Sequence, residues 1–157
     1  MDQAFTIYSG FFLATAFVSF FVASLAWQRR SVKGAKELTR LMLAAGVWSF
    51  LIIFETASIS VNDKILWAKL AYLGAVSTPL FYFLFVLRFT GKDRFISTKN
   101  IVYLFIIPLI TLLLTFTNEL HGLIWSGFSA ISASTNMMEF HHGIAFWIGY
   151  MTYNYLL

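Results

Sequence analysis

The segment Ile65–Leu87 reads ILWAKLAYLGAVSTPLFYFLFVL and carries one charged side chain, that of Lys69. An α-helix rises 1.5 Å per residue, so about 20 mostly apolar residues cross the roughly 30 Å hydrocarbon core of a bilayer. Stretches of similar length and character recur along the chain. We therefore expect an all-α integral membrane bundle with about five transmembrane helices. They are expected at residues 4–27, 41–60, 65–89, 101–117 and 143–157.

The composition supports a membrane protein. Hydrophobic residues make up 59% of the chain and charged residues 11%, whereas about a quarter of the residues in soluble domains are charged. The net charge of +4 does not indicate nucleic acid, because the basic residues lie in short gaps between the apolar stretches. The expected partner is the lipid bilayer. With no cysteine, disulfides and thiolate metal sites are excluded.

The basic residues predict the orientation. Short connections rich in lysine and arginine remain in the cytoplasm, and residues 28–40 and 88–99 are both of this kind. We therefore expect a multi-pass protein of the plasma membrane with its N-terminus outside. The residues assigned to the cytoplasmic basic loops are Arg29, Arg30, Lys33, Lys36, Arg40, Lys92 and Arg94.

Residues 118–142 are expected to form one external loop. The segment Leu120–Met138 has no formal charge, but its many serine, threonine and asparagine side chains are too polar for a lipid-facing helix. Treating it as a further span would place Glu139, His141 and His142 in a cytoplasmic loop without a basic residue. A loop of this length in a compact helical protein is often functional.

Two charges fall inside the apolar stretches. Glu55 and Lys69 are each about five residues from the external ends of the second and third helices. Because an unpaired charge in a membrane is costly, we expect the two to pair, either as a structural clamp or as part of a polar sensor site. Pro79 and Pro108 are expected to kink the third and fourth helices, and each kink is open to interpretation as packing or as a hinge.

No catalytic constellation is present. The chain has no glycine-rich phosphate loop, nucleophile elbow or carboxylate dyad, so we do not expect it to be an enzyme or to hold a cofactor. His121, His141 and His142 lack the spacing of helix-borne metal ligands. No metal site is predicted, and loop hydrogen bonding or pH sensing are the readings left open for these histidines.

Four strings of residues, in order along the chain, resemble one family. They are Trp27-Gln-Arg-Arg, Trp67-Ala-Lys-Leu-Ala-Tyr72, Thr117-Asn-Glu-Leu-His-Gly-Leu-Ile-Trp125 and the segment Gly143–Tyr153. Together they resemble the N-terminal seven-transmembrane region of bacterial and archaeal sensor histidine kinases, which also heads some diguanylate cyclases. The resemblance implies seven helices, an external N-terminus and a cytoplasmic PAS, kinase or cyclase output domain. Relative to that pattern the chain stops in helix five, and we expect a fragment.

The function expected from these features is that of a sensory input module in a signal-transduction protein. It would pass an external or intramembrane signal to the cytoplasmic domain of its parent, and a homodimer is left open. Two alternatives remain: a small transporter with Glu55 as a proton-coupled site, and a non-catalytic subunit of a membrane complex. The candidate ligand or coupling residues are Glu55, Lys69, Trp67, Asn118, His121 and Trp125.

Overall fold

The computed structural model describes residues 4–157. Four of its helices are long and apolar enough to cross a membrane. These are α1 (Ile7–Gln28), α2 (Ala35–Ala57), α3 (Val61–Phe89) and α4 (Thr98–Phe116). A short helix, α5 (Thr152–Leu156), continues a π-helical segment over Phe146–Met151. The expectation of an all-α membrane bundle is confirmed.

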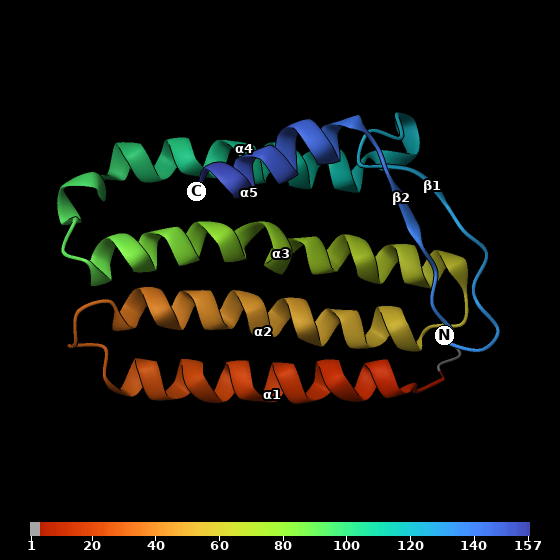
Figure 1. The fold of residues 1–157 in the computed structure, drawn as a ribbon, viewed down its shortest axis with the longest axis horizontal. Coiled ribbons are helices and arrows are strands. Elements are labelled where there is room, and N and C mark those ends of the chain that lie inside the picture. Colours follow the sequence, from red (N-terminus) through yellow and green to blue (C-terminus); the bar gives the residue numbers. More distant parts are fainter. Residues whose placement is uncertain (1–3) are drawn as a thin grey trace.

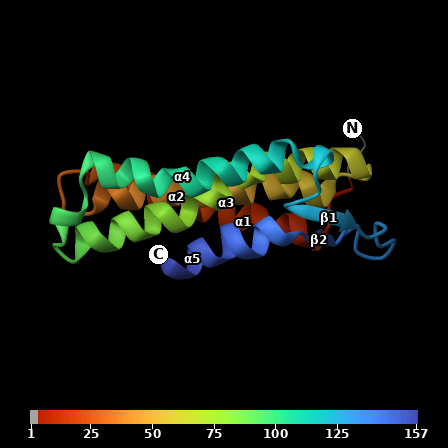
Figure 2. The same cartoon turned by 90° about the horizontal axis from the view of Figure 1, so that it is seen from above.

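The first three helices form a single layer. Figure 1 shows α1, α2 and α3 side by side, with α2 in the middle, and α2 packs against both neighbours. The helices α4 and α5 lie beyond α3, where the Tyr153 hydroxyl donates to the main-chain oxygen of Leu104 at 2.6 Å. Seen from above in Figure 2, α3 lies between and beneath them.

The two ends of the bundle differ in chemistry. One end holds the α1–α2 connection (residues 29–34) and the α3–α4 connection (residues 90–97), and we call it the basic end. The other end holds the α2–α3 turn and a two-stranded hairpin, and we call it the hairpin end. The described N-terminal residues also lie at the hairpin end, where the main-chain N–H of Ala4 donates to Ala57.

Small side chains let the helices of the layer approach closely. A Cβ atom added at Gly74 of α3 would lie 2.7 Å from the Cβ of Trp48 in α2. A Cβ atom added at Gly46 of α2 would lie 2.8 Å from the Phe20 ring of α1. Ser9 of α1 and Thr56 of α2 are also joined by a buried hydroxyl–hydroxyl hydrogen bond of 3.0 Å. Packing of small residues and buried hydrogen bonds are common means of holding membrane helices together.

The second helix begins earlier than expected. It starts at Ala35, so Lys36 and Arg40 lie in its first two turns and not in the connection, which corrects their assignment to a loop. Hydropathy locates only the apolar part of a helix. The residues before that part, Ala35–Leu38, are alanine, lysine, glutamate and leucine. All four favour helix, so α2 extends beyond its apolar part. Pro79 and Pro108 lie inside α3 and α4, and both helices continue through them. The predicted kinks stay predictions.

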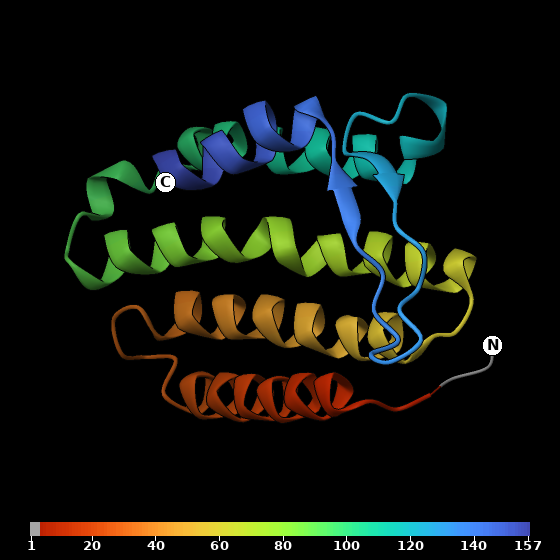
Figure 3. The same cartoon turned by 45° about the vertical axis from the view of Figure 1, so that its right-hand side comes forward.

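The segment 118–142 has a defined structure. A single 3₁₀ turn over Asn118–Leu120 is followed by β1 (Trp125–Phe128) and β2 (Phe140–His142), which pair antiparallel with Gly127 opposite His141. Figure 3 shows the chain between the strands descending past α3 to the end of α2. The hairpin therefore covers the end of the three-helix layer.

Candidate functional site

The hairpin covers a hollow of about 490 Å³, which we call the hairpin-end cavity. Its volume is within the range of small-molecule sites. Trp48, in the lining, is 41% exposed. The lining comes from α1, α2, α3 and the hairpin and consists of Phe12, Trp48, Ile52, Glu55, Thr56, Ala68, Ala71, Tyr72, Trp125, Met137, Met138, Glu139, Phe140 and His142.

Glu55 is the one charged side chain of the helices in this lining. It is only 8% exposed. Among residues 4–157, no hydrogen-bond donor and no basic side chain within 4 Å pairs with its carboxylate. The expected pair with Lys69 is wrong. The ammonium group of Lys69 is instead bonded to Glu119 and to the main-chain oxygen of Phe116, on the other side of α3.

Lys64 is the basic residue nearest the end of α2, and the sequence interpretation missed it. Its side chain is fully buried. The ammonium group donates to the main-chain oxygens of Glu55 at 2.9 Å and Asn136 at 2.7 Å. The side-chain amide of Asn136 donates in turn to the main-chain oxygens of Thr56 and Ser58. These bonds fasten the tip of the hairpin to the end of α2, above the cavity.

Aromatic side chains form most of the remaining wall. Trp125 of β1 is 3% exposed and lies with its ring centroid 5.3 Å from that of Tyr72, edge to face. Its ring is also 5.1 Å from that of Phe140. On the α2 side, the absence of a side chain at Gly74 leaves the space that Trp48 occupies.

Asn118 holds Trp125 in place. Its side-chain oxygen accepts from the main-chain N–H groups of Ile124 and Trp125, both at 3.0 Å, and its amide donates to the Trp125 oxygen at 2.9 Å. All three bonds are buried. Asn118 is therefore a positioning residue of the cavity wall and does not line the cavity itself.

Three of the predicted site residues lie away from the cavity. Lys69 faces α4, as described above, and Trp67 stacks on Phe54 at 4.7 Å. The Nδ1 atom of His121 accepts from the Leu123 N–H at 3.0 Å, so its Nε2 carries the hydrogen that faces the Thr117 hydroxyl. The structure thus brings together Glu55, Trp125 and, through its hydrogen bonds, Asn118.

The histidines do not form a metal centre in the described part of the chain, residues 4–157. His142 stacks on Phe146 with ring centroids 3.6 Å apart. Burial lowers the pKa of His142 below its ordinary value of 6.5. Burial therefore favours the neutral form of the imidazole beside the cavity.

The basic end carries a network of ion pairs. Asp93, in the α3–α4 connection, pairs with Lys33 of the α1–α2 connection and with Arg88 of α3, both at 3.1 Å. Arg88 also approaches Glu37 of α2 at 3.5 Å. The neighbouring Lys33 ammonium, with a smaller effect from Arg88, holds the pKa of Asp93 below its usual value. The network joins the α1–α2 connection, α2 and α3 to the α3–α4 connection.

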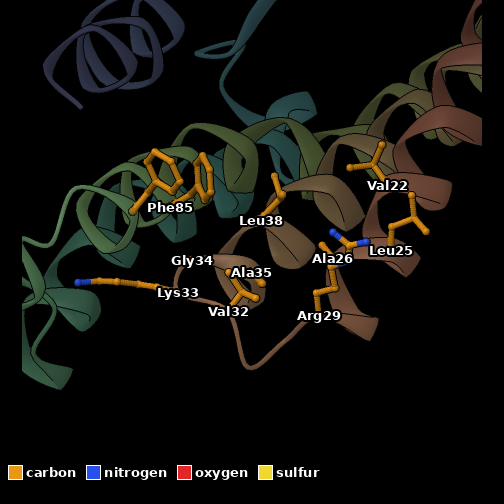
Figure 4. A pocket seen from close by; sticks show the side chains of 11 residues that line it. Val22, Leu25, Ala26, Arg29, Val32, Lys33, Gly34, Ala35, Leu38 and Phe85 are labelled. Atoms are coloured by element: carbon orange, nitrogen blue, oxygen red, sulfur yellow. The ribbon is translucent and has the colours of Figure 1, made fainter.

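A second hollow of about 440 Å³, the basic-end groove, adjoins this network. In Figure 4 the α1 side chains Val22 and Leu25 lie on one side and Phe85 of α3 lies on the other, with Leu38 of α2 between them. The ammonium group of Lys33 reaches away from the groove towards Asp93. The groove has no buried carboxylate in its lining, in contrast to the hairpin-end cavity.

A comparison with protein-family models matches residues 11–157 to the family described as the N-terminal 7TM region of histidine kinase. The chain belongs to this family. The match covers α1 from residue 11 onwards, the other three long helices, the hairpin and α5, so the resemblance inferred from the four sequence strings is confirmed. Searches of curated proteins and of solved structures gave no significant match.

Membership of the histidine-kinase 7TM family fixes the general role of the chain. It is a multi-pass membrane sensory module, and this region is non-catalytic. The expectations of a membrane location and a signalling role are confirmed. The cavity, with its buried carboxylate, lies within the matched residues.

Proposed function

We propose that the hairpin-end cavity is the signal-receiving site of this sensory module, and that the basic end passes the signal to a cytoplasmic output domain of the parent protein. The output domain is a kinase or cyclase module in this proposal. The observation that carries it is Glu55, a buried carboxylate without a protein partner among the described residues, in an aromatic cavity of ligand-binding size.

The orientation follows from the charges. Lysine and arginine favour the cytoplasmic side, and the basic end holds Arg29, Arg30 and Lys33 in one connection and Lys92 and Arg94 in the other. The hairpin end then faces the external medium or the external leaflet, and the N-terminus is outside. In this arrangement a signal reaches the cavity from the side opposite the output domain.

Transmission has a physical route through the three-helix layer. The cavity is lined by α1, α2 and α3, and the ion pairs of Glu37, Arg88 and Asp93 connect α2, α3 and the next connection at the other end. A ligand shifts such a bundle only if it binds one packing arrangement better than another. Occupancy of the cavity therefore changes the spacing of the helices, and this change extends to the connections at the basic end.

The test measures the distance between the two connections of the basic end when the cavity is filled by a larger side chain. Because the chain has no native cysteine, spin labels at Ser31→Cys and Lys92→Cys report the distance between the two basic connections in nanodiscs. Ala71→Leu adds bulk inside the cavity, since Ala71 is 1% exposed and lines it. The proposal expects this variant to shift the distance distribution between the labels.

The matched control is Ala14→Leu, which makes the same change at an exposed position of α1 and is expected to leave the distribution unchanged. Ile52→Phe, a second cavity-filling change, guards against a folding defect in one variant. Folded cavity variants with the same distance distribution as the parent chain would overturn the proposal.

A further inference from the structure

The charges on the cavity wall are unusual for a site in an apolar bundle. Glu55 lies deep in the wall and Glu139 lies at its exposed edge. Neither carboxylate forms an ion pair with another described residue. Of the other described acidic residues, Glu37, Asp93 and Glu119 form ion pairs and Asp63 does not. The lining therefore contains two acidic side chains and no lysine or arginine.

Among the basic groups near the cavity, Lys64 is close enough to interact electrostatically with Glu55, but its ammonium group does not bond to the carboxylate. The ammonium group of Lys64 is held by two main-chain oxygens, is fully buried and is absent from the lining. Lys69 pairs with Glu119 on the far side of α3. His142, the remaining titratable nitrogen in the lining, is packed flat against Phe146.

The rest of the wall suits an apolar cation. The lining that contains Glu55 also contains five aromatic side chains, those of Phe12, Trp48, Tyr72, Trp125 and Phe140. Aromatic faces attract ammonium groups, most strongly where water is excluded, and cages of such rings are used to bind quaternary ammonium ligands. A cation bound beside Glu55 favours the ionised form of the carboxyl group, and in surroundings of low dielectric constant the two charges attract each other more strongly than they would in water.

We propose that the hairpin-end cavity binds a hydrophobic organic cation, a substituted amine or quaternary ammonium compound, with Glu55 as its counter-ion and the aromatic rings around its apolar groups. This inference rests on the proposed function, because it names the ligand class of the same site. A neutral apolar ligand would leave Glu55 buried without a partner, and an anion would be repelled by both carboxylates.

The test uses a pair of compounds of the same shape. Benzyltrimethylammonium and its neutral isostere neopentylbenzene differ in one atom and in charge. Both are titrated calorimetrically into the chain in nanodiscs, and titrations of empty nanodiscs remove partition into lipid. We expect the cation to bind the chain at least ten-fold more tightly than the neutral isostere.

Two variants assign the difference to the cavity. Glu55→Gln is expected to weaken binding of the cation at least ten-fold and to leave the neutral isostere within two-fold. Glu119→Gln removes the same charge near the same end but outside the lining, and it is expected to change neither affinity by more than two-fold. Equal binding of the two compounds to the parent chain, or cation binding unaffected by Glu55→Gln, would overturn the inference.

The outcome also separates the ligand class from the proposed function. If the cation binds through Glu55 but neither it nor the cavity-filling variants move the spin labels at the basic end, the signalling route fails and the ligand class stands. If the cavity-filling variants move the labels while the cation fails to bind, the ligand class fails and the signalling site stands.

Discussion

The buried ammonium group of Lys64 donates to the main-chain oxygen of Asn136, which lies 72 positions further along the chain, at 2.7 Å. Asn136 has a positive φ of 55°, a conformation that asparagine tolerates better than most residues. In this position its amide also donates to the main-chain oxygens of Thr56 and Ser58 at the end of α2. One lysine and one asparagine thus hold the hairpin over the cavity.

Replacing Asn136 by glycine should loosen the hairpin. Asn136→Gly preserves the positive φ but removes the amide that donates to Thr56 and Ser58. Each such hydrogen bond contributes about 1 kcal/mol, so local opening should become roughly ten-fold more frequent or more. Amide hydrogen exchange of residues 129–139 measures this. The control is Ser134→Gly, an exposed change in the same loop; similar exchange in the two variants would show that Asn136 does not fasten the hairpin.

Removing the Asn118 side chain should disorder the aromatic wall. Asn118→Ala abolishes three buried hydrogen bonds to Ile124 and Trp125, and buried groups left without partners cost about 1–3 kcal/mol each. We expect a loss of about 3 kcal/mol in unfolding free energy. The tryptophan emission should also shift to longer wavelength as Trp125 becomes hydrated.

The matched control for this change is Asn100→Ala. Asn100 is exposed at the start of α4 and its amide donates to a single carbonyl, that of Phe95. A loss of about 1 kcal/mol or less is expected there. Equal losses in the two asparagine variants, with unchanged emission, would contradict the positioning role of Asn118.

A methyl group at Gly74 should separate α2 from α3. Its carbon would lie 2.7 Å from the Trp48 side chain and 2.5 Å from the Ala44 oxygen, and overpacking of this kind costs about 1–3 kcal/mol. Gly74→Ala should therefore lower the melting temperature and move Trp48, which the fluorescence of a chain retaining this one tryptophan can follow. Gly10→Ala, in α1 with open space around the new carbon, should be neutral or stabilising. A neutral Gly74→Ala would show that the helices do not approach as closely as described.

The Lys69–Glu119 pair should depend on pH in a defined direction. The hydrogen bond from Lys69 lowers the pKa of Glu119 below 4.5. The contribution of the Lys69–Glu119 pair to the free energy of unfolding is therefore complete above about pH 4.5. It is lost as the pH falls through the lower pKa of Glu119 in the folded state. Because the Glu119 side chain is 63% exposed, the pair is expected to stabilise by only about 1 kcal/mol.

Melting curves of the parent chain and Glu119→Gln measure this contribution. Their difference should be constant from neutral pH down to about pH 4.5 and should shrink below it. In a Lys69→Gln background the Glu119 change should have little further effect. A difference that grows on acidification, or one that persists unchanged in the Lys69→Gln background, would contradict the pairing.

Hydropathy alone predicted the membrane helices, because a span is decided by the length and apolar content of a continuous segment. The partner of Lys69 was not predictable in this way. Lys64 and Lys69 are five residues apart, about 500° of helical rotation, so they point in directions about 140° apart around α3. Hydropathy does not fix the rotation of α3 about its axis, so the sequence did not show that Lys64 faces α2 and that Lys69 faces α4.

The hairpin was missed for a different reason. The strands β1 and β2 are four and three residues long and are separated by a serine-rich stretch, so neither has a periodic pattern of its own. Their pairing depends on the hydrogen bond that the Trp125 N–H donates to the Asn118 side chain and on the hydrogen bond that Asn136 donates to Thr56 of α2. Of the cavity residues, Glu55 and Trp125 were identifiable from the sequence, whereas Trp48, Tyr72 and Phe140 join them only through the fold.

Thiol labelling tests the transmembrane arrangement most directly. The chain contains no cysteine, so Ser31→Cys at the basic end and Ser134→Cys in the hairpin loop each introduce a single reactive group at an exposed position. In intact cells, an impermeant thiol reagent should label the cysteine at position 134 and should label position 31 only after the membrane is opened. Labelling of position 31 in intact cells would contradict an external hairpin-end cavity that signals to the cytoplasm.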